Sequence, residues 1–122
     1  MNPPAGHSPD HNQALARRGE DLAAAWYVDR GYDVVARNWR TRQGELDLVM
    51  RNGRSYVFCE VKARSTGVFG EPEEAVRRAK QQRIRVLAAR WLEEEAGGHA
   101  REIRFDVAAV RGSRVDVIEG AF

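Results

Sequence analysis

The chain lacks several features that would each point to a particular class of protein. It has a single cysteine, Cys59, so it cannot form an intramolecular disulfide, which fits a reducing compartment. No apolar run approaches the ~20 residues that a bilayer-spanning helix needs, and the opening MNPPAGHSPDHNQ has no apolar core of the signal-peptide kind. Net charge is only +2, so no global field attracts nucleic acid. We therefore expect a cytoplasmic protein with no membrane partner.

Lysine is also scarce, although the chain is rich in arginine. Of its 20 basic residues, only Lys62 and Lys80 are lysines. A lysine ammonium is a compact point charge with an adjustable pKa, which a guanidinium cannot offer. Either these two positions need an ammonium group, or the pattern reflects composition and chance.

The 122 residues are enough for one small domain. Residues 1–12 hold three of the four prolines and predict a disordered tail, which leaves a single domain over 13–122. Helical periodicity and two-residue alternation predict an α/β fold of order α-β-β-β-α-β-β, with a mixed sheet flanked by helices. The predicted helices cover 13–30 and 73–95, and a loop covers 65–72. The predicted strands cover 32–38, 45–51, 54–63, 102–110 and 114–118.

Charged side chains interrupt the predicted hairpin GELDLVMRNGRSYVFCEVKAR, residues 44–64. A two-residue turn at 52–53 pairs the strands so that Glu45 faces Glu60. Opposed residues, and residues two apart on one strand, share a sheet face. An odd-length loop would split the charged residues between both faces, so the prediction depends on the parity of the turn. The side chains that then share one face are Glu45, Asp47, Glu60 and Lys62.

Crowded carboxylates on a half-buried sheet repel one another, which leaves two explanations. Either this end of the sheet is open to water, or a divalent cation binds there. Mg²⁺ and Mn²⁺ prefer carboxylate, water and phosphate oxygens, so Asp47, Glu60 and Glu45 are candidate metal ligands. Lys62 would orient a water molecule or stabilise charge on a phosphate. These groups suit metal-assisted phosphodiester hydrolysis.

Two further regions add candidate site residues. Lys80 lies in the middle of the apolar stripe of the second predicted helix, so it must extend to solvent, pair or serve a site, and Gln81 flanks it. Around residues 37–42, basic side chains surround Trp39, which suits a nucleic-acid backbone with one stacking platform, or else a loop with a packing tryptophan. Cys59 points to the opposite face from Glu60 and is expected in the core. The candidate nucleic-acid contacts are Arg37, Asn38, Arg40, Arg42, Arg64 and Lys80.

A set of short motifs runs through the chain: GE at 19–20, RN at 37–38, GELDLV at 44–49, FCEVKAR at 58–64, KQxRI at 80–84, RFDV at 104–107 and the terminal AF. Motifs in this order and spacing resemble those of the YraN-like family of small bacterial proteins. That family is similar to Holliday-junction resolvases of the restriction-endonuclease-like, PD-(D/E)xK fold. The resemblance implies that Asp47, Glu60 and Lys62 occupy the motif positions of a nuclease. It also implies that Glu20, otherwise a solvated flank of the first helix, completes the site. Leu46 departs from the motif, which has proline there.

The resemblance further implies an Mg²⁺- or Mn²⁺-dependent DNA endonuclease, selective for branched or single-stranded DNA and working as a homodimer. In this view Asp47, Glu60, Lys62, Glu20 and Gln81 form the catalytic set. A rival from another class is a non-catalytic nucleic-acid-binding or partner-recruiting module on the same fold. A nuclease acting on RNA is a third alternative, although nothing in the sequence reports a pocket for a 2′-hydroxyl.

Overall fold

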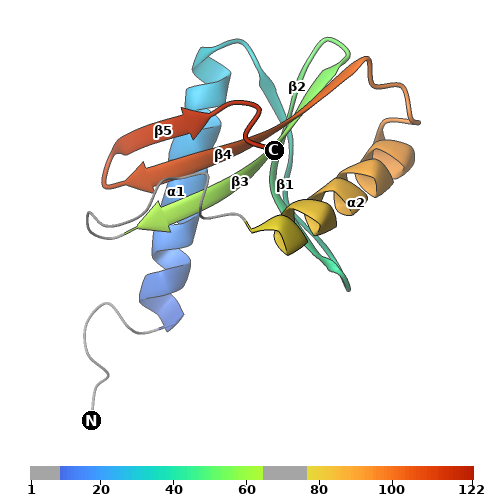
Figure 1. Ribbon diagram of the computed structural model, residues 1–122. Coiled ribbons are helices and arrows are strands. Elements are labelled where there is room, and N and C mark those ends of the chain that lie inside the picture. The colour runs from blue at the N-terminus through green and yellow to red at the C-terminus, as the bar shows by residue number, and fades with distance from the viewer. Residues whose placement is uncertain (1–8, 65–76) are drawn as a thin grey trace.

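Two helices and a five-stranded sheet make up the computed structural model, which describes residues 9–64 and 77–122 (Figure 1). The α/β class and the order α-β-β-β-α-β-β are confirmed. The helices are α1 (Pro9–Asp29) and α2 (Arg78–Glu95). The strands are β1 (Asp33–Thr41), β2 (Gly44–Asn52), β3 (Ser55–Arg64), β4 (Glu102–Arg111) and β5 (Arg114–Ile118). Neither helix is both long and apolar enough to cross a membrane in the residues described.

The sheet is mixed, as predicted, with the strands arranged in their order along the chain. Neighbouring strands are antiparallel except for β3 and β4, which run parallel over their whole length. A parallel pair requires a crossover connection, and α2 lies in the segment that joins β3 to β4. Because β3 has β2 on one side and β4 on the other, it is a central strand.

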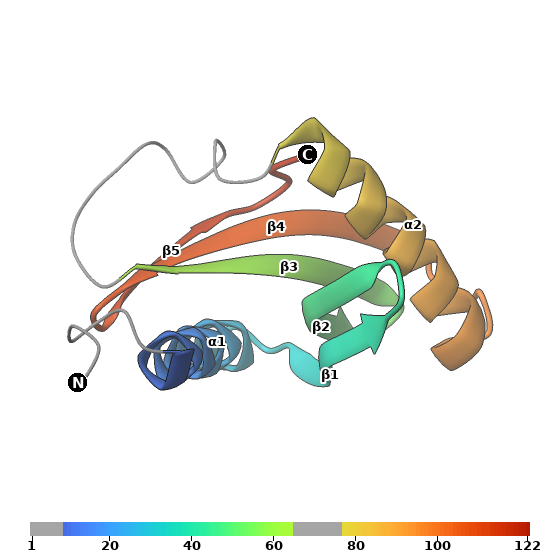
Figure 2. The same cartoon turned by 90° about the horizontal axis from the view of Figure 1, so that it is seen from below.

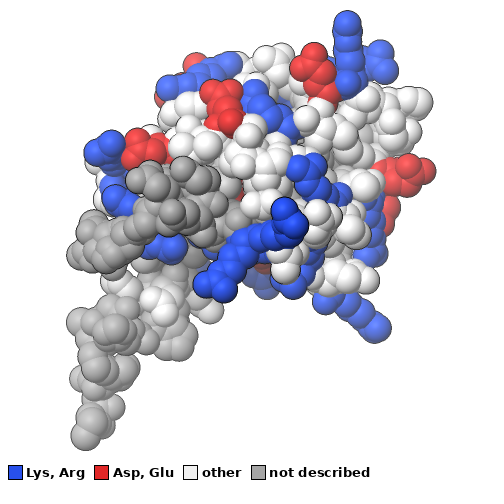
Figure 3. Space-filling view, in the orientation of Figure 1, with Lys and Arg blue, Asp and Glu red and all other residues white. Residues whose placement is uncertain are grey.

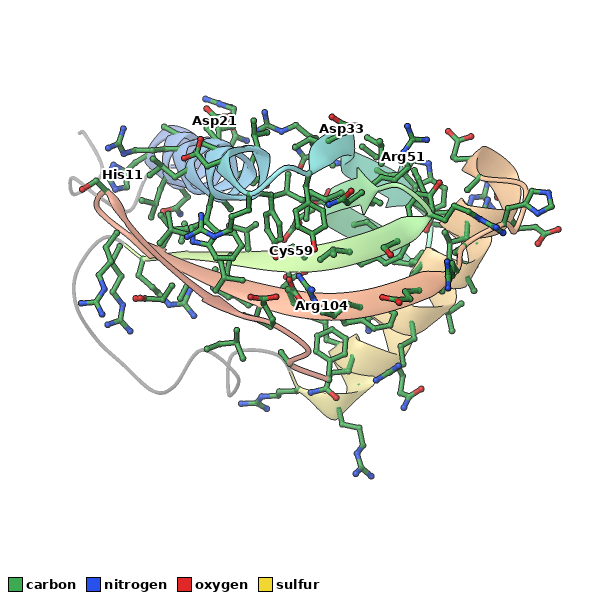
Figure 4. The ribbon with its side chains drawn as sticks, turned by 90° about the horizontal axis from the view of Figure 1, so that it is seen from above. His11, Asp21, Asp33, Arg51, Cys59 and Arg104 are labelled. Carbon is green, nitrogen blue, oxygen red and sulfur yellow. The ribbon has the colours of Figure 1, made fainter. Side chains whose placement is uncertain are left out.

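The two helices cover opposite faces of the sheet (Figure 2). On one face, Tyr27 of α1 packs with Leu48 and Cys59. On the other, Trp91 of α2 packs with Phe58, whose ring centroid lies 6.0 Å away. Successive strand residues therefore serve different cores, as the pleat requires. The expected core position of Cys59 is confirmed, and Figure 4 shows this residue between β3 and α1.

Element boundaries differ from the predictions chiefly in α1 and β1. Helix α1 begins at Pro9, so residues 9–12 belong to the helix rather than to the expected tail; proline is well tolerated in a first helical turn. Strand β1 continues three residues beyond the predicted end, because it pairs with β2 as far as Thr41 opposite Gly44. The predicted loop at 65–72, the predicted helical residues 73–76 and tail residues 1–8 lie outside the described residues.

The predicted register of the β2–β3 hairpin is wrong by two residues. Asn52 pairs with Ser55, so the turn lies at 53–54, where Gly53 has a φ of 63°. The ladder pairs Val49 with Phe58, and Glu45 therefore does not face Glu60. A shift of two residues leaves every side chain on its predicted face, because the strand repeat is two.

Candidate active site

Strands β2 and β3 separate at the end of the hairpin that carries the acidic residues. Their ladder stops at Leu48 opposite Cys59, although both strands continue beyond that pair. From there β2 is paired only with β1, and β3 follows β4 as far as Arg64 opposite Arg111. A cavity of about 140 Å³ lies at the divergence. Four carboxylates meet here, and we call them the acid gap: Glu20, Glu45, Asp47 and Glu60.

Glu20 reaches the acid gap because α1 lies very close to β3. A Cβ atom on Gly19 would stand 2.8 Å from the Cβ of Ala63, closer than packed side chains approach, so only glycine permits this contact. The neighbouring Glu20 is buried, with 7% of its surface exposed. Its Oε1 accepts a hydrogen bond of 2.9 Å from Nδ2 of Asn38. The alternative that Glu20 is a solvated flank is therefore wrong.

Asp47 lies across the gap from β3 and holds the two strands together through its side chain. Its Oδ2 accepts a hydrogen bond of 2.9 Å from the backbone N–H of Val61. Burial, and then the negative charge of Glu60, raise the pKa of Asp47 to about 8, with the Val61 N–H acting in the opposite direction. Carboxylate oxygens of Asp47, Glu20 and Glu45 lie within 4.8 Å of one another.

Glu60 forms ion pairs with both lysines of the chain. The Nζ of Lys80 lies 2.5 Å from Oε1 of Glu60, and the Nζ of Lys62 lies 3.7 Å from the same oxygen. Lys80 therefore pairs with the site rather than extending into solvent alone. Burial, and then the charge of Lys80, lower the pKa of Lys62. Burial also acts on Lys80, but the hydrogen bond and charge of Glu60 outweigh it and raise the pKa of Lys80.

The structure groups the acids differently from the prediction. The predicted metal ligands were Asp47, Glu60 and Glu45, whereas the three acids whose oxygens cluster are Glu20, Glu45 and Asp47. Glu60 lines the same cavity but is engaged by two ammonium groups.

Several predicted nucleic-acid contacts are engaged within the protein. Arg37 forms an ion pair with Asp21 of α1, and Nε of Arg40 lies 2.8 Å from Oε2 of Glu45. Trp39 packs against the core on the α2 side, as the packing alternative proposed. Arg42 and Arg64 are exposed.

Basic side chains surround the acid gap. Figure 3 shows them gathered over the first turns of α2 and the tip of the β1–β2 hairpin, whereas acidic groups reach the surface at the C-terminal end of α2. Gln81 is half-buried in the first turn of α2, next to Lys80. Arg83 lines the cavity and was not among the predicted site residues. Its spacing of three from Lys80, which places both on one helix face, was the available indication. The exposed arginines of these elements include Arg40, Arg42, Arg78, Arg83, Arg85 and Arg90.

The donor set suits a hard divalent cation. It consists of carboxylate oxygens in a half-buried cavity, the ligands that Mg²⁺ and Mn²⁺ prefer. In the described part of the chain, no lysine or arginine lies within ion-pair distance of Asp47 or Glu20. No basic side chain that the structure describes therefore competes with a cation for these two carboxylates, although Lys62 and Lys80 stand beside them.

The chain matches other proteins over most of its length. Residues 19–110 match the model of the Uncharacterised protein family UPF0102. A UPF0102 protein of Beutenbergia cavernae is 54% identical over 101 residues, which cover 83% of this chain and 85% of the relative. One from Frankia casuarinae is 52% identical over 115 residues, covering 89% and 96%. A third, from Rhodococcus jostii, is 49% identical over 100 residues, covering 82% and 84%. With the family model spanning the acid gap and both lysines, this chain belongs to the UPF0102 family.

Proposed function

We propose that this protein is a divalent-metal-dependent endonuclease that hydrolyses phosphodiester bonds in DNA. The observation that carries the proposal is the acid gap itself: carboxylates from β2 and β3 line one cavity, the carboxylate of Glu20 on α1 lies within 4.8 Å of two of them, and two lysines stand alongside. Buried carboxylates that repel one another destabilise a fold unless something binds them. The resemblance to junction resolvases and the basic surroundings favour DNA as the ligand that shares the site.

Each residue of the acid gap has a role that follows from its contacts. Asp47, Glu45 and Glu20 would hold Mg²⁺ or Mn²⁺, and Glu60 lines the same cavity. The bound cation would polarise the phosphate and lower the pKa of a water molecule, so that hydroxide is available near neutral pH.

The two lysines have different proposed roles. Lys62 is 21% exposed and lies 3.7 Å from Glu60, so its ammonium can turn to a phosphate oxygen or hold a water molecule. Lys80 is held at 2.5 Å and keeps Glu60 in place, with Gln81 supporting it from the same turn of α2. Lys62 is accordingly the better candidate for contact with the reacting phosphate.

DNA binding would rest on the arginines around the cavity rather than on net charge, which is only +2. Arginine side chains neutralise phosphates and release counterions, and they need no particular base sequence. Arg83 in the cavity wall and Arg42 and Arg64 at exposed positions are the proposed phosphate contacts, with Arg40 and Lys80 nearer the acids.

Cleavage of a defined set of DNA substrates tests the proposal. The set contains linear duplex, single-stranded, flap and four-way junction DNA, each with Mn²⁺ or with EDTA. We expect cleavage with Mn²⁺ only, lost in Asp47→Asn and kept in Asp33→Asn, which changes an exposed aspartate on β1. Binding of DNA without cleavage of any substrate, and without uptake of Mn²⁺, would replace the nuclease by a binding module. An RNA strand included in the set tests the third alternative, and gel filtration with light scattering tests the homodimer.

A further inference from the structure

Asn38 has an unusual backbone conformation in the middle of β1. Its φ is +52°, and among residues 9–64 and 77–122 it is the one residue other than glycine with a positive φ. This left-handed conformation costs free energy for any residue with a Cβ atom, and asparagine is one of the few that tolerate it. Strained residues of this kind cluster at functional sites.

The strained backbone breaks the alternation of side chains along β1. Ala36 and Trp39 pack against the core on the α2 side of the sheet. Between them, the side chains of both Arg37 and Asn38 turn to α1, where they bond Asp21 and Glu20. A regular strand would have sent one of these two side chains to the opposite face. The conformation of Asn38 therefore aims its amide at Glu20.

The contact that results is a neutral one. Nδ2 of Asn38 donates to Oε1 of Glu20 at 2.9 Å, and an amide donor orients a carboxylate without cancelling its charge. Glu45 and Glu60 differ, because each pairs with a positively charged side chain.

The position of Asn38 in the sheet links this contact to Asp47. The β1–β2 ladder pairs Arg37 with Leu48 and Trp39 with Leu46. Between these two pairs, Asn38 stands at the level of Asp47. Asp47 and Glu20 in turn have carboxylate oxygens within 4.8 Å of each other. The strained residue is thus adjacent to the two acids of the acid gap, Glu20 and Asp47, that lack a lysine or arginine partner in the described residues.

We infer that Asn38 is a positioning residue, which fixes the carboxylate of Glu20 at the acid gap and leaves its charge available to a divalent cation. The inference rests on the proposed function, because it assigns a role toward the same metal. It also replaces the predicted role of Asn38 as a nucleic-acid contact. Partners that orient metal ligands from behind commonly change metal affinity by about 10–100-fold when removed.

Two substitutions at Asn38 separate positioning from a merely structural role. Asn38→Gly removes the amide and adopts the positive φ without strain, so its melting temperature should equal or exceed that of the wild type. Asn38→Ala also removes the amide but keeps the strain, so it should melt lower. If Asn38 positions Glu20, both variants bind Mn²⁺ about tenfold more weakly in calorimetric titrations of the metal alone. Asn52→Gly, at an exposed position at the other end of the hairpin, should bind Mn²⁺ like the wild type.

A double-mutant cycle identifies the residue through which Asn38 acts. In the background of Glu20→Gln, the change Asn38→Gly should cause no further loss of Mn²⁺ affinity. A further tenfold loss in that background would overturn the inference. The inference would also be overturned if only the less stable variant, Asn38→Ala, bound Mn²⁺ more weakly, or if both variants bound Mn²⁺ as tightly as the wild type. Failure of the wild-type protein to bind Mn²⁺ would instead remove the proposed function, and the inference with it.

Discussion

Within residues 9–64 and 77–122, buried carboxylates occur at two places, and their surroundings are opposite. Asp106 on β4 is fully buried and surrounded by donors. The hydroxyl of Tyr27 lies 2.5 Å from its Oδ2, Arg104 donates from Nε at 2.8 Å and from a terminal nitrogen at 3.0 Å, and the N–H of Gly120 donates at 3.0 Å. Figure 4 shows Arg104 in the middle of the sheet. One guanidinium neutralises one carboxylate, and both of its oxygens are hydrogen-bonded.

In the acid gap, the carboxylates outnumber their partners. Asp47 accepts one backbone N–H, Glu20 accepts one amide, and their nearest charged neighbours are other acids. Burial raises the pKa of Asp47 to about 8, with Glu60 adding to the effect. The comparison teaches that burial alone does not mark a functional acid. Asp106 is the more deeply buried, and both of its oxygens have donors; in the acid gap Asp47 and Glu20 have no lysine or arginine partner among the described residues, and a cation would supply that positive charge.

The largest expected effect comes from removing the charge of Asp106. Asp106→Asn is nearly isosteric, but it leaves the buried side of Arg104 without its carboxylate and misplaces at least one donor. We expect a loss of roughly 2–4 kcal/mol of unfolding free energy, with an unchanged gain in stability from Mn²⁺. Chemical denaturation with and without Mn²⁺ measures both. Asp116→Asn, which breaks a surface pair with Arg114, is the control and should cost less than about 1 kcal/mol. A cost at Asp106 no larger than the control would show that the network is dispensable.

The second prediction concerns a guanidinium, the group that neutralises Asp106, placed beside the acid gap. Lys62→Arg replaces a compact ammonium by a planar guanidinium. If Lys62 contacts the reacting phosphate or its water, single-turnover cleavage should fall at least ~100-fold, a loss of about 2.7 kcal/mol of transition-state stabilisation. The melting temperature should stay close to that of the wild type. Cleavage within a few-fold of the wild-type rate would remove Lys62 from the mechanism.

In the third prediction an Asp→Asn change raises the unfolding free energy, whereas in the first it lowers it. Asp47→Asn keeps an acceptor for the Val61 N–H and removes one repelling charge, so it should stabilise the metal-free protein by at least ~0.5–1 kcal/mol near pH 8. The gain depends on pH, because Asp47 keeps its proton to about pH 8 when folded but loses it near pH ~4 when unfolded. The unfolding free energy of the wild type should therefore fall as pH rises through that window, and this part of the slope should be absent in the variant.

Thermal melting in EDTA from pH 5 to pH 8 measures this difference, and a parallel series with millimolar Mn²⁺ measures the metal response. Mn²⁺ should stabilise the wild type more than Asp47→Asn. A variant that is less stable in EDTA at every pH, with a metal response equal to wild type, would identify Asp47 as a structural hydrogen-bonding group.

The smallest effect concerns the arginines near the acid gap. Replacing Arg40 and Arg42 together by alanine should reduce the slope of log affinity for DNA against log salt by about 1–2, because each phosphate contact contributes nearly one unit. Arg51→Ala with Arg54→Ala, at the other end of the hairpin, removes the same charge from exposed positions and should leave that slope unchanged. Equal slopes in both double variants would place the DNA path away from the tip of the β1–β2 hairpin.

Local patterns in the sequence were enough to predict the element order and the shared face of the acids. Alternation and helical spacing report burial directly, and the parity of the 44–64 hairpin survived a register error of two residues. The family resemblance predicted Glu20 at the site, whereas helical periodicity alone predicted a solvated flank of the first helix. For Lys80 in an apolar stripe, the pattern left extension to solvent, pairing and a role in a site open, and the structure shows pairing with Glu60.

Long-range features of the site could not be predicted in the same way. The β2–β3 ladder ends at Leu48 because β1 and β4 hold the two strands beyond it, and pairings with distant strands leave no local pattern. The positive φ of Asn38 is likewise set by the structure around it. The donors to Asp106 come from residues 79 and 14 positions away, as well as from Arg104 nearby.

The acid gap also depends on the assembly of three layers. Glu20 comes from the helix on one face of the sheet, Lys80 from the helix on the other, and the remaining acids from strands between them (Figure 2). No single layer holds the site, so a chain with either helix undocked would lack it. We therefore expect cation binding to report complete folding: Mn²⁺ should slow amide hydrogen exchange in α1 and α2 together, although the two helices lie on opposite sides of the molecule. Protection of only one helix would mean that the two layers can open independently of the site.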